Sequence, residues 1–599
     1  MKLLRLKINE DFRSLKVDTD GKGFEVEFLR PFEMEKKWDF MPYCLAGRNG
    51  SGKSNILEAL AAIFYHIECI YLGNRPEDFD FDEVKNPFGF REEKSTPDSY
   101  ELEYLFPIPV GLVNKTITDL AKKTLKDFNA HISITKEVGK QPIVKWLNRV
   151  EFADMNEAKE ILNRVEVKQF LPKYIIGYSS GENEILSLPF FKMRYIHYDE
   201  YEEALREETG YSQPEGRMVY LDTLYSQAVF LTNYLMQNEK VLEPIHNTIG
   251  IKSITQFRII IQESPPIPKY RLDEGTIEEQ SLAPEYNSFF ELTQNLKRKD
   301  ESLKDLKPID KLKNCATSQF YDAENKTLYL DFFVDADKKD ENGNVIPGEM
   351  KKAFRGNFDN AFELFQAFQV LLTLNLYGVD RKLKKELYRS GSLYANETVP
   401  VLPSDKRIMR FKNFEIEKEK VDKGLLTKSL SDGEYQFLHS MGICLLFKDT
   451  NSLFLLDEPE THFNPDWRAK FITTLRDCLK AEEKDILRDL LITTHSPFLI
   501  SDTQKSNVLK FVKDLDTGVV KCDRPEFNTF GASVNQITIE MFNKPDTIGD
   551  YANESISTFE KRFEEGENIQ ELIKEINVKM GDSIEKTILI NRLLGNIKK

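Results

Sequence analysis

Eight residues near the N-terminus, 47–54, have the types and spacing of a phosphate-binding loop. They read Gly-Arg-Asn-Gly-Ser-Gly-Lys-Ser and fit the pattern G-x-x-x-x-G-K-[ST]. Glycines allow backbone N–H groups to converge on phosphate oxygens, Lys53 can reach the β- and γ-phosphates, and the Ser54 hydroxyl can bind Mg²⁺. We therefore expect a nucleotide site formed by Gly47, Asn49, Gly50, Ser51, Gly52, Lys53, Ser54 and Asn55.

The segments on either side of this loop support that interpretation. Residues 43–46 form a short apolar run that predicts a strand. Residues 53–67 have apolar positions at helical spacing. Strand, loop and helix thus follow each other in the order that a phosphate loop requires, which disfavours a chance match.

Two carboxylates end a second apolar strand, predicted over 452–456. Asp457 could hold Mg²⁺, and Glu458 could polarise the water that attacks the γ-phosphate. A strand that merely ends in polar residues is the alternative. Beside a phosphate loop we favour the metal and catalytic roles, and we expect ATP and Mg²⁺ as cofactors.

His495 follows a third apolar strand, predicted over 490–494. A histidine at a strand tip could contact the γ-phosphate and sense its presence, although a lone histidine is more often structural. Its place shortly after the acid pair favours the catalytic role.

A short polar motif, Ser431-Asp432-Gly433-Glu434, precedes a helical run over 435–447. Backbone N–H groups at a helix start can bind an anion. Ser431 and Glu434 also have the spacing of a capping box, which is the plain structural alternative. The two interpretations use the same donors and do not exclude each other.

Composition limits the class of protein. The 599 residues are 40% hydrophobic and 30% charged, with a net charge of −16, so a general attraction to nucleic acid is not supported. No run approaches about 18 apolar residues, so we expect no membrane association. Six cysteines without a C-x-x-C pair indicate free thiols and a cytoplasmic location.

The pattern of the whole chain predicts an α/β head assembled from both ends of the sequence. We divide it into an N-terminal lobe (1–110), a mixed insertion (111–400) that returns to the head near 170–200, a C-terminal lobe (401–515) and a helical tail (516–599). Helices are predicted over 154–165, 217–239, 285–313 and 358–377, and a hairpin turn at 342–343. No heptad pattern is long enough for an extended coiled coil.

The order of these motifs resembles the ABC-type ATPase heads of the SMC, RecF and OLD groups. The resemblance covers residues 1–66 and 425–505. It implies that two heads meet head to tail, so that residues 431–434 serve the partner's nucleotide and residues 461–466 form a D-loop. Asp432 and Glu434 depart from the transporter signature and resemble the OLD-like branch. Residues 178–183 are the candidate for the Q-loop.

Residues 9–15 (NEDFRSL) resemble the first-hairpin loop of RecF-like heads, where a basic residue approaches the nucleotide. Arg13 is the candidate for that contact. A solvated arginine is the alternative.

Three further stretches resemble ATPases of bacterial restriction and anti-phage systems, including restriction-associated AAA-family ATPases and, more distantly, Septu-type and PARIS-type subunits. They are FLPKYIIGYSSGENEILSLPFF (170–191), DEPETHFNPDW and FGASVNQIT. The resemblance implies a sensor or scaffold that forms a homodimer or higher oligomer and controls an effector nuclease. A RecF-like DNA-repair ATPase, and a nuclease with its own unrecognised site, stay open as alternatives, as does nucleic-acid binding.

Overall fold

The structure is a computed structural model. It describes residues 1–38, 41–73, 75–109, 112, 129–152, 159–180, 186–207, 216–220, 222–262, 267–268, 286–287, 307–341, 345–379, 381–391, 399, 402–479, 486–544 and 548–595.

A seven-stranded sheet forms the centre of the molecule, in the order β21-β20-β3-β19-β18-β7-β8. All neighbouring pairs are parallel except β20 with β21. Parallel strands covered on both faces are almost wholly apolar, and β3, β18 and β19 are buried along their full length. The strands are β3 (Tyr43–Gly47), β7 (Ile175–Ser179), β8 (Met218–Tyr220), β18 (Leu453–Asp457), β19 (Asp489–Thr494), β20 (Val508–Lys513) and β21 (Val520–Asp523).

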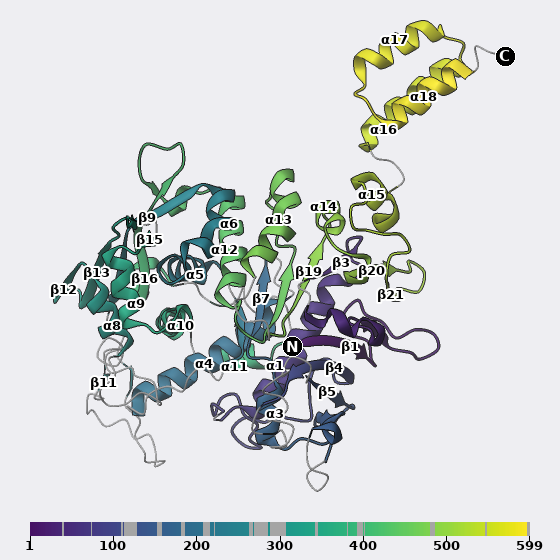
Figure 1. Cartoon of the computed structure of the whole chain (residues 1–599). Coiled ribbons are helices and arrows are strands. Elements are labelled where there is room, and N and C mark those ends of the chain that lie inside the picture. Colours follow the sequence, from purple (N-terminus) through teal and green to yellow (C-terminus); the bar gives the residue numbers. More distant parts are fainter. Residues whose placement is uncertain are drawn as a thin grey trace.

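This sheet joins segments from both ends of the chain. β3 lies between β19 and β20, and β7 lies beside β18 (Figure 1). Helix α1 (Lys53–Tyr71) follows β3 directly and packs on the sheet. The α/β head predicted from the sequence is therefore confirmed. The carboxyl ends of β3, β18 and β19 meet at one edge, where the phosphate loop, the acid pair and His495 follow.

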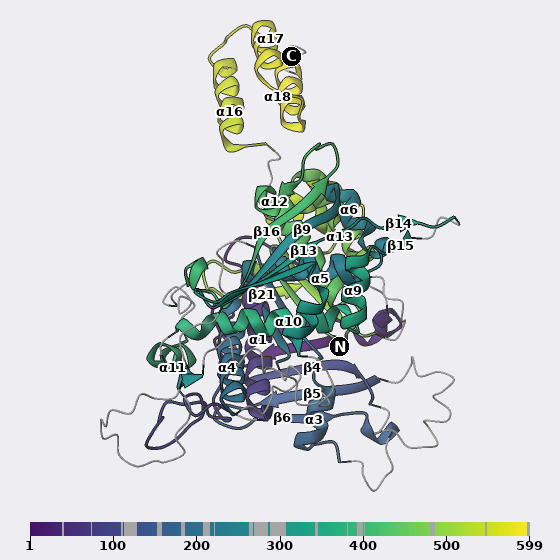
Figure 2. The same cartoon turned by 90° about the vertical axis from the view of Figure 1, so that its left-hand side faces the viewer.

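A second, antiparallel sheet has the order β2-β1-β4-β5-β6, and Figure 2 shows β4, β5 and β6 running side by side. β5 pairs with β4, and β6 pairs with β5, so residues 129–146 belong to the same sheet as β1. The strands are β1 (Lys2–Ile8), β2 (Phe24–Glu27), β4 (Tyr100–Pro107), β5 (Asn129–Lys136) and β6 (Ile143–Trp146).

The third sheet, in the order β12-β13-β9-β16-β17, belongs mainly to the insertion. β16 pairs with β9 over most of its length, so residues 409–418 lie in this sheet. The strands are β9 (Ile251–Gln262), β12 (Ser318–Asp322), β13 (Thr327–Phe333), β16 (Met409–Lys418) and β17 (Leu425–Leu426).

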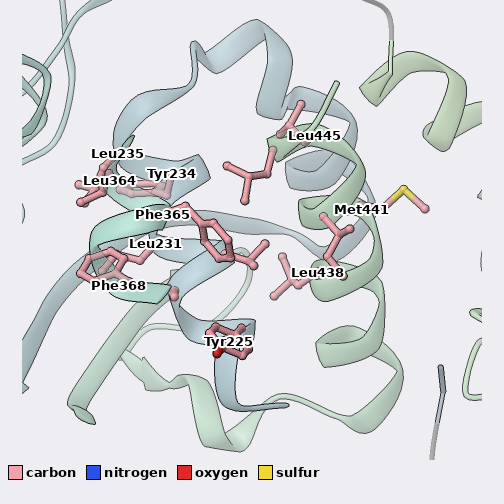
Figure 3. Packing of buried hydrophobic residues seen from close by; sticks show 14 of the residues in the cluster. Tyr225, Leu231, Tyr234, Leu235, Leu364, Phe365, Phe368, Leu438, Met441 and Leu445 are labelled. Carbon is pink, nitrogen blue, oxygen red and sulfur yellow. The ribbon is translucent and has the colours of Figure 1, made fainter. Parts of the chain in front are cut away.

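Helices α5 (Thr223–Met236), α10 (Ala361–Thr373) and α12 (Asp432–Leu446) hold the insertion against the head. Their facing side chains pack together, with Tyr225 and Leu231 of α5, Phe365 and Phe368 of α10, and Leu438 of α12 on the sides that face one another (Figure 3). The strong apolar periodicity that predicted a helix over 358–377 is thus the α10 face of this core, although its last turn is a 3-10 helix (Leu374–Gly378).

Two predicted helices differ from the observed elements. Residues 217–239 are not one helix, since Met218–Tyr220 form β8 before α5 begins. Residues 159–163 of the predicted 154–165 helix are not helical, and α3 (Arg164–Phe170) begins after the Asn163 cap. The predicted turn at 342–343 and most of the predicted 285–313 helix lie outside the described residues, and α8 covers only Pro308–Cys315.

Shorter elements complete the described fold. The two-stranded pairs are β10 (Ile267–Pro268) with β11 (Tyr286–Asn287), and β14 (Lys338–Lys339) with β15 (Val345–Ile346). The remaining helices of the main body are α4 (Ser187–Glu207), α6 (Glu239–Ile249), α9 (Glu349–Asn357), α11 (Arg381–Arg389), α13 (Pro465–Cys478) and α14 (Pro497–Ser501).

The expected tail divides into two parts. β21 and α15 (Val534–Phe542) pack on the head, because Ile537 and Met541 share a core with Cys44 and Ala46. Helices α16 (Asp550–Glu564), α17 (Ile569–Lys579) and α18 (Ile584–Gly595) have a separate small core and stand apart from the main body (Figure 1). Over the described residues, none of the helices is both long and apolar enough to cross a membrane.

Candidate nucleotide site

The phosphate loop lies between the end of β3 and the start of α1. Gly50 and Gly52 have φ values of 73° and 89°, a left-handed conformation that suits glycine. Arg48, Asn49 and Gly50 are exposed at the tip. The Ser51 hydroxyl is buried and has no hydrogen-bond partner among the residues that the structure describes. An unsatisfied buried hydroxyl beside exposed loop backbone fits a site that takes polar oxygens from a ligand.

Lys53 is folded back over this loop. Its Nζ donates to the carbonyl oxygens of Gly47 (3.0 Å) and Arg48 (3.2 Å) and lies 3.0 Å from His495 Nε2. Burial lowers the pKa of Lys53 to about 8, against the opposing effect of Glu458 and Asp457. Phosphate oxygens would stabilise the ammonium better than the carbonyls that hold it here.

Asp457 is buried at the end of β18 and receives hydrogen bonds from two hydroxyls. Ser54 Oγ lies 2.8 Å and Thr493 Oγ1 2.5 Å from Asp457 Oδ1. Burial raises the pKa of Asp457, and these hydrogen bonds oppose that effect. A carboxylate beside a hydroxyl supplies the hard oxygen ligands that Mg²⁺ prefers, so Ser54 and Asp457 fit this ion.

Glu458 has a different environment from its neighbour. Its φ of 48° turns it out of the strand direction, a conformation that is uncommon for residues other than glycine and is found at functional sites. Its N–H donates to Thr493 Oγ1 (3.0 Å). Glu458 Oε1 lies 3.4 Å from His495 Nε2, and this histidine lowers the pKa of the carboxyl. A half-exposed, ionised carboxylate suits a general base.

His495 stands between Lys53 and Glu458. The same ring nitrogen faces both groups. A neutral imidazole nitrogen can accept from the Lys53 ammonium, whereas a protonated one can only donate, and would donate to Glu458. The two arrangements exclude each other, so His495 is placed to respond when Lys53 moves.

Several polar residues around the acid pair were missed from the sequence. Ser180 donates through its hydroxyl to the Glu458 carbonyl and lies 2.8 Å from Thr461 Oγ1. Glu460 is buried and accepts from the Thr494 hydroxyl, and burial raises its pKa to about 7. Ser180 lies in the stretch expected to form the Q-loop, of which residues 181–183 lie outside the described part.

The motif 431–434 starts α12 as expected. Ser431 caps the helix, and Glu434 bonds back to the Ser431 N–H (2.9 Å), so the capping box is present. Ser431 and Asp432 are exposed, and Glu434 is paired with Lys418. Gly433 lies against the segment after the acid pair, where an added Cβ would come within 2.7 Å of the His462 carbonyl. Among the described residues, none of these four has a hydrogen bond to the phosphate loop of the same chain.

Arg13 is not a solvated side chain. Its guanidinium pairs with Glu58 at 2.9 Å and donates to the Gly391 carbonyl at 3.3 Å. Asn55 is buried, donates to Glu58 and accepts from the Ser14 N–H. Both residues therefore contact the first turns of α1 and the loop that covers it, rather than the phosphate loop itself.

Three closely spaced aspartates near α1, which could suggest a metal site, already have protein partners. Asp78 pairs with Lys385 and Asp80 with Arg75, while Asp82 accepts from two backbone N–H groups of its own turn. The described residues contain no cluster of three or more metal-ligating side chains.

Parts of the chain are similar to known proteins. A family model described as "AAA domain, putative AbiEii toxin, Type IV TA system" matches residues 258–501. Protein ea59 of Escherichia phage lambda is 27% identical over 24% of this chain and 27% of its own length. The Septu protein PtuA of Bacillus thuringiensis is 27% identical over 22% of this chain and 32% of its own length. The chain thus aligns with about a third or less of either relative.

Among solved structures, the SMC head domain from Thermotoga maritima is 10% identical, covers 88% of this chain and 100% of its own, and has a TM-score of 0.32. A Smc head domain with a coiled coil and joint derived from Pyrococcus yayanosii has a TM-score of 0.26 at 12% identity, over 88% of this chain and 97% of that one. The matched AAA domain includes the acid pair, His495 and the motif 431–434, and the sheet brings the phosphate loop to the same edge. Residues 258–501 thus match an AAA domain, and the protein is an ATPase whose phosphate loop completes the nucleotide site from outside the matched segment.

Proposed function

We propose that this ATPase is a sensor or scaffold subunit of a bacterial restriction or anti-phage system. ATP would join two copies head to tail, and the joined form would control a partner effector nuclease. The similarity to the Septu protein PtuA supports the defence role. This similarity covers only part of each chain, so experiments have to identify the partner and its activity.

One observation carries the head-to-tail arrangement. Lys53, Asp457, Glu458 and His495 gather at one edge of the central sheet, whereas Ser431 and Asp432 are exposed at the start of α12. A helix start that caps itself and is open to solvent can present its N–H groups to the phosphates of a second copy. Each nucleotide would then lie between two chains.

The residues of the site have separable roles in this proposal. Lys53 and the loop backbone would bind the phosphates, and Ser54 with Asp457 would hold Mg²⁺, which supplies charge neutralisation at the phosphates when bound. Glu458 would take the proton of the attacking water. His495 would exchange its contact with Lys53 for one with the nucleotide, and thereby report that ATP is present.

Mass measurement with a trapped variant tests this proposal. Glu458→Gln keeps the size of the side chain but removes the base, so bound ATP should persist. We expect this variant to double in mass with ATP and Mg²⁺, and Lys53→Ala to stay monomeric under the same conditions. A Glu458→Gln protein that binds ATP and yet stays monomeric would contradict the head-to-tail dimer.

Assays with the purified chain separate the alternatives. We expect no metal-dependent cleavage of DNA or RNA and no stimulation of the ATPase by DNA. Cleavage that is lost in Glu458→Gln, or that needs no partner, would favour a self-contained nuclease. Strong stimulation by DNA would favour the RecF-like alternative.

A further inference from the structure

A cavity of about 360 Å³ lies beside α1, outside the phosphate loop. Its walls are one face of α1 from Glu58 to His66, the segment 78–96, the first turn of α4 and the end of α11 with residues 390–391. None of the residues 47–54 lines it. Its size falls within the range of small-molecule sites, which begins at about 300 Å³.

The cavity is cationic although the chain as a whole is acidic. Five cations and two carboxylates line it, whereas the net charge of the chain is −16. Both carboxylates are already paired, Glu58 with Arg13 and Asp78 with Lys385. The lining therefore has positive charge to spare for an anion.

Lys192 is one of three cavity cations, with Arg91 and Lys94, that have no ion pair among the described residues. It enters the cavity from the first turns of α4, and within the described part of the chain its ammonium has no ion pair or hydrogen bond. Burial lowers its pKa to about 8. Lys192 is partly exposed, so its unpaired ammonium is less well solvated than one in open water, and a bound anion would stabilise it.

His66 is a second unsatisfied group in the same cavity. It is 2% exposed, and among the described residues neither ring nitrogen has a partner with full hydrogen-bond geometry, although the Glu92 backbone lies near enough to act on its pKa. Burial lowers its pKa to about 4, so the ring is neutral and offers one donor and one acceptor. That pair of functions suits the polar edge of a heterocycle.

Aromatic rings provide flat surfaces beside these groups. Phe79 and Phe90 stack at 5.0 Å between centroids, and Phe90 also lies 5.7 Å from the His66 ring. Phe88 is 73% exposed at the rim, with the Arg389 guanidinium 5.5 Å from its centroid. Aromatic faces bind the rings of nucleobases by stacking.

We propose that this cavity is a second ligand site, which takes a nucleoside monophosphate and communicates with the ATP site. Lys192 binds the phosphate, while His66 and the phenylalanines bind the base. Arg91 and Lys94 line the same cavity and can add to the charge that attracts the phosphate. ATP has a separate site at the phosphate loop.

The route to the ATP site runs through the wall of the cavity. Arg13 and Glu58 line the cavity and pair with each other, and Glu58 also accepts from Asn55, the residue after Ser54. A phosphate near Lys192 would compete with Glu58 for Arg13, and this would alter the first turn of α1. This coupling rests on the ATPase function, but binding at the cavity does not.

Calorimetry with AMP and GMP tests the binding step in the Lys53→Ala protein, in which the phosphate loop no longer binds nucleotide. We expect at least one of the two to bind, more tightly than inorganic phosphate alone. Lys192→Met should weaken that binding about tenfold or more, because it removes the charge that the phosphate meets. The matched control, Lys574→Met on exposed α17, should leave binding unchanged.

Two results would overturn the site. One is that AMP and GMP bind the Lys53→Ala protein equally well with and without Lys192→Met. The other is that neither nucleotide binds the folded Lys53→Ala protein at millimolar concentration. Lys192→Met should fold, since it replaces an unpaired ammonium by an apolar group of similar length. The ligand should change the ATPase rate of the wild type and not of Lys192→Met. Binding without any change of rate would overturn the coupling but not the site.

Discussion

Asp457 and Glu458 are neighbours in sequence with opposite electrostatic environments. Burial raises the pKa of Asp457, whereas His495 lowers the pKa of Glu458. The buried group is placed to hold a metal ion that offsets its burial, and the half-exposed group to act as a base. Different roles for the two carboxylates thus follow from their surroundings rather than from their spacing.

Substitution of each carboxylate by its amide separates these roles. We expect Glu458→Gln to lower the single-turnover rate by about 10²- to 10⁴-fold and to retain ATP affinity, as loss of a general base does. Asp457→Asn should instead make the ATP affinity depend less on the Mg²⁺ concentration. Equilibrium ATP binding at several Mg²⁺ concentrations measures the difference. A Glu458→Gln protein with a wild-type rate would exclude this base.

Lys192 gives a pH-dependent prediction. Its pKa is about 8 in the folded chain against an ordinary 10.5, so protonation disfavours folding and this cost is fully present below pH 8. We expect Lys192→Met to unfold at a higher temperature than the wild type at pH 7. The difference should shrink as the pH rises from 8 toward 10.5. A difference that is the same at pH 7 and pH 10 would contradict an unpaired, poorly solvated ammonium.

The sequence alone was sufficient to predict the site residues that belong to local motifs. It was insufficient to predict those that long-range packing brings to the site. Lys53, Ser54 and the acid pair follow strands with clear patterns. Ser180 reaches Glu458 from the end of a separate strand, and Glu460 is buried where it accepts a hydrogen bond from Thr494. Arg13 was placed near the nucleotide, but Glu58, one turn into α1, holds it. Only the folded chain reveals such partners.

At the scale of elements, the start of α12 depends on a close backbone approach. Gly433 has room for no Cβ, because the His462 carbonyl would lie 2.7 Å from it. Gly433→Ala should push the helix start away from the segment after the acid pair. The geometry of 431–434 would change without any contact to the phosphate loop of its own chain.

We therefore expect Gly433→Ala to reduce ATP hydrolysis and to leave ATP affinity of the monomer unchanged. Gly356→Ala is the matched control, since that glycine lies in α9 with open space around its Cβ and alanine favours helices. Steady-state hydrolysis and equilibrium ATP binding of both variants give the comparison. Equal hydrolysis by the two variants would show that the approach at Gly433 does not matter.

The elements that the sequence mispredicted share a physical cause. Met218–Tyr220 have the apolar character of a helix face, yet they pair in parallel with β7 and form the edge of the central sheet. Short apolar runs do not distinguish a strand from a helix, and tertiary pairing decides. The α/β core could be predicted because its long strands are wholly apolar and each precedes a motif.

At the scale of the molecule, helices α16, α17 and α18 form a unit of their own. Phe559, Leu572, Ile576, Leu589 and Leu593 make a small core within this unit. We expect a chain that ends at residue 544 to keep the ATPase rate and the unfolding temperature of the main body. Thermal unfolding and hydrolysis assays of this shortened chain check the point. A large loss of stability would mean that the main body depends on these helices.

The central claim is that each ATP site is shared by two chains, and mixing two inactive variants tests it most directly. Lys53→Ala removes the phosphate loop function, and Ser431→Arg blocks the start of α12. Each variant alone should be inactive. In a mixed dimer one of the two sites has both parts intact, so an equal mixture should recover about a quarter of the wild-type rate. No recovery, with mixed dimers demonstrated by affinity tags, would contradict the shared site.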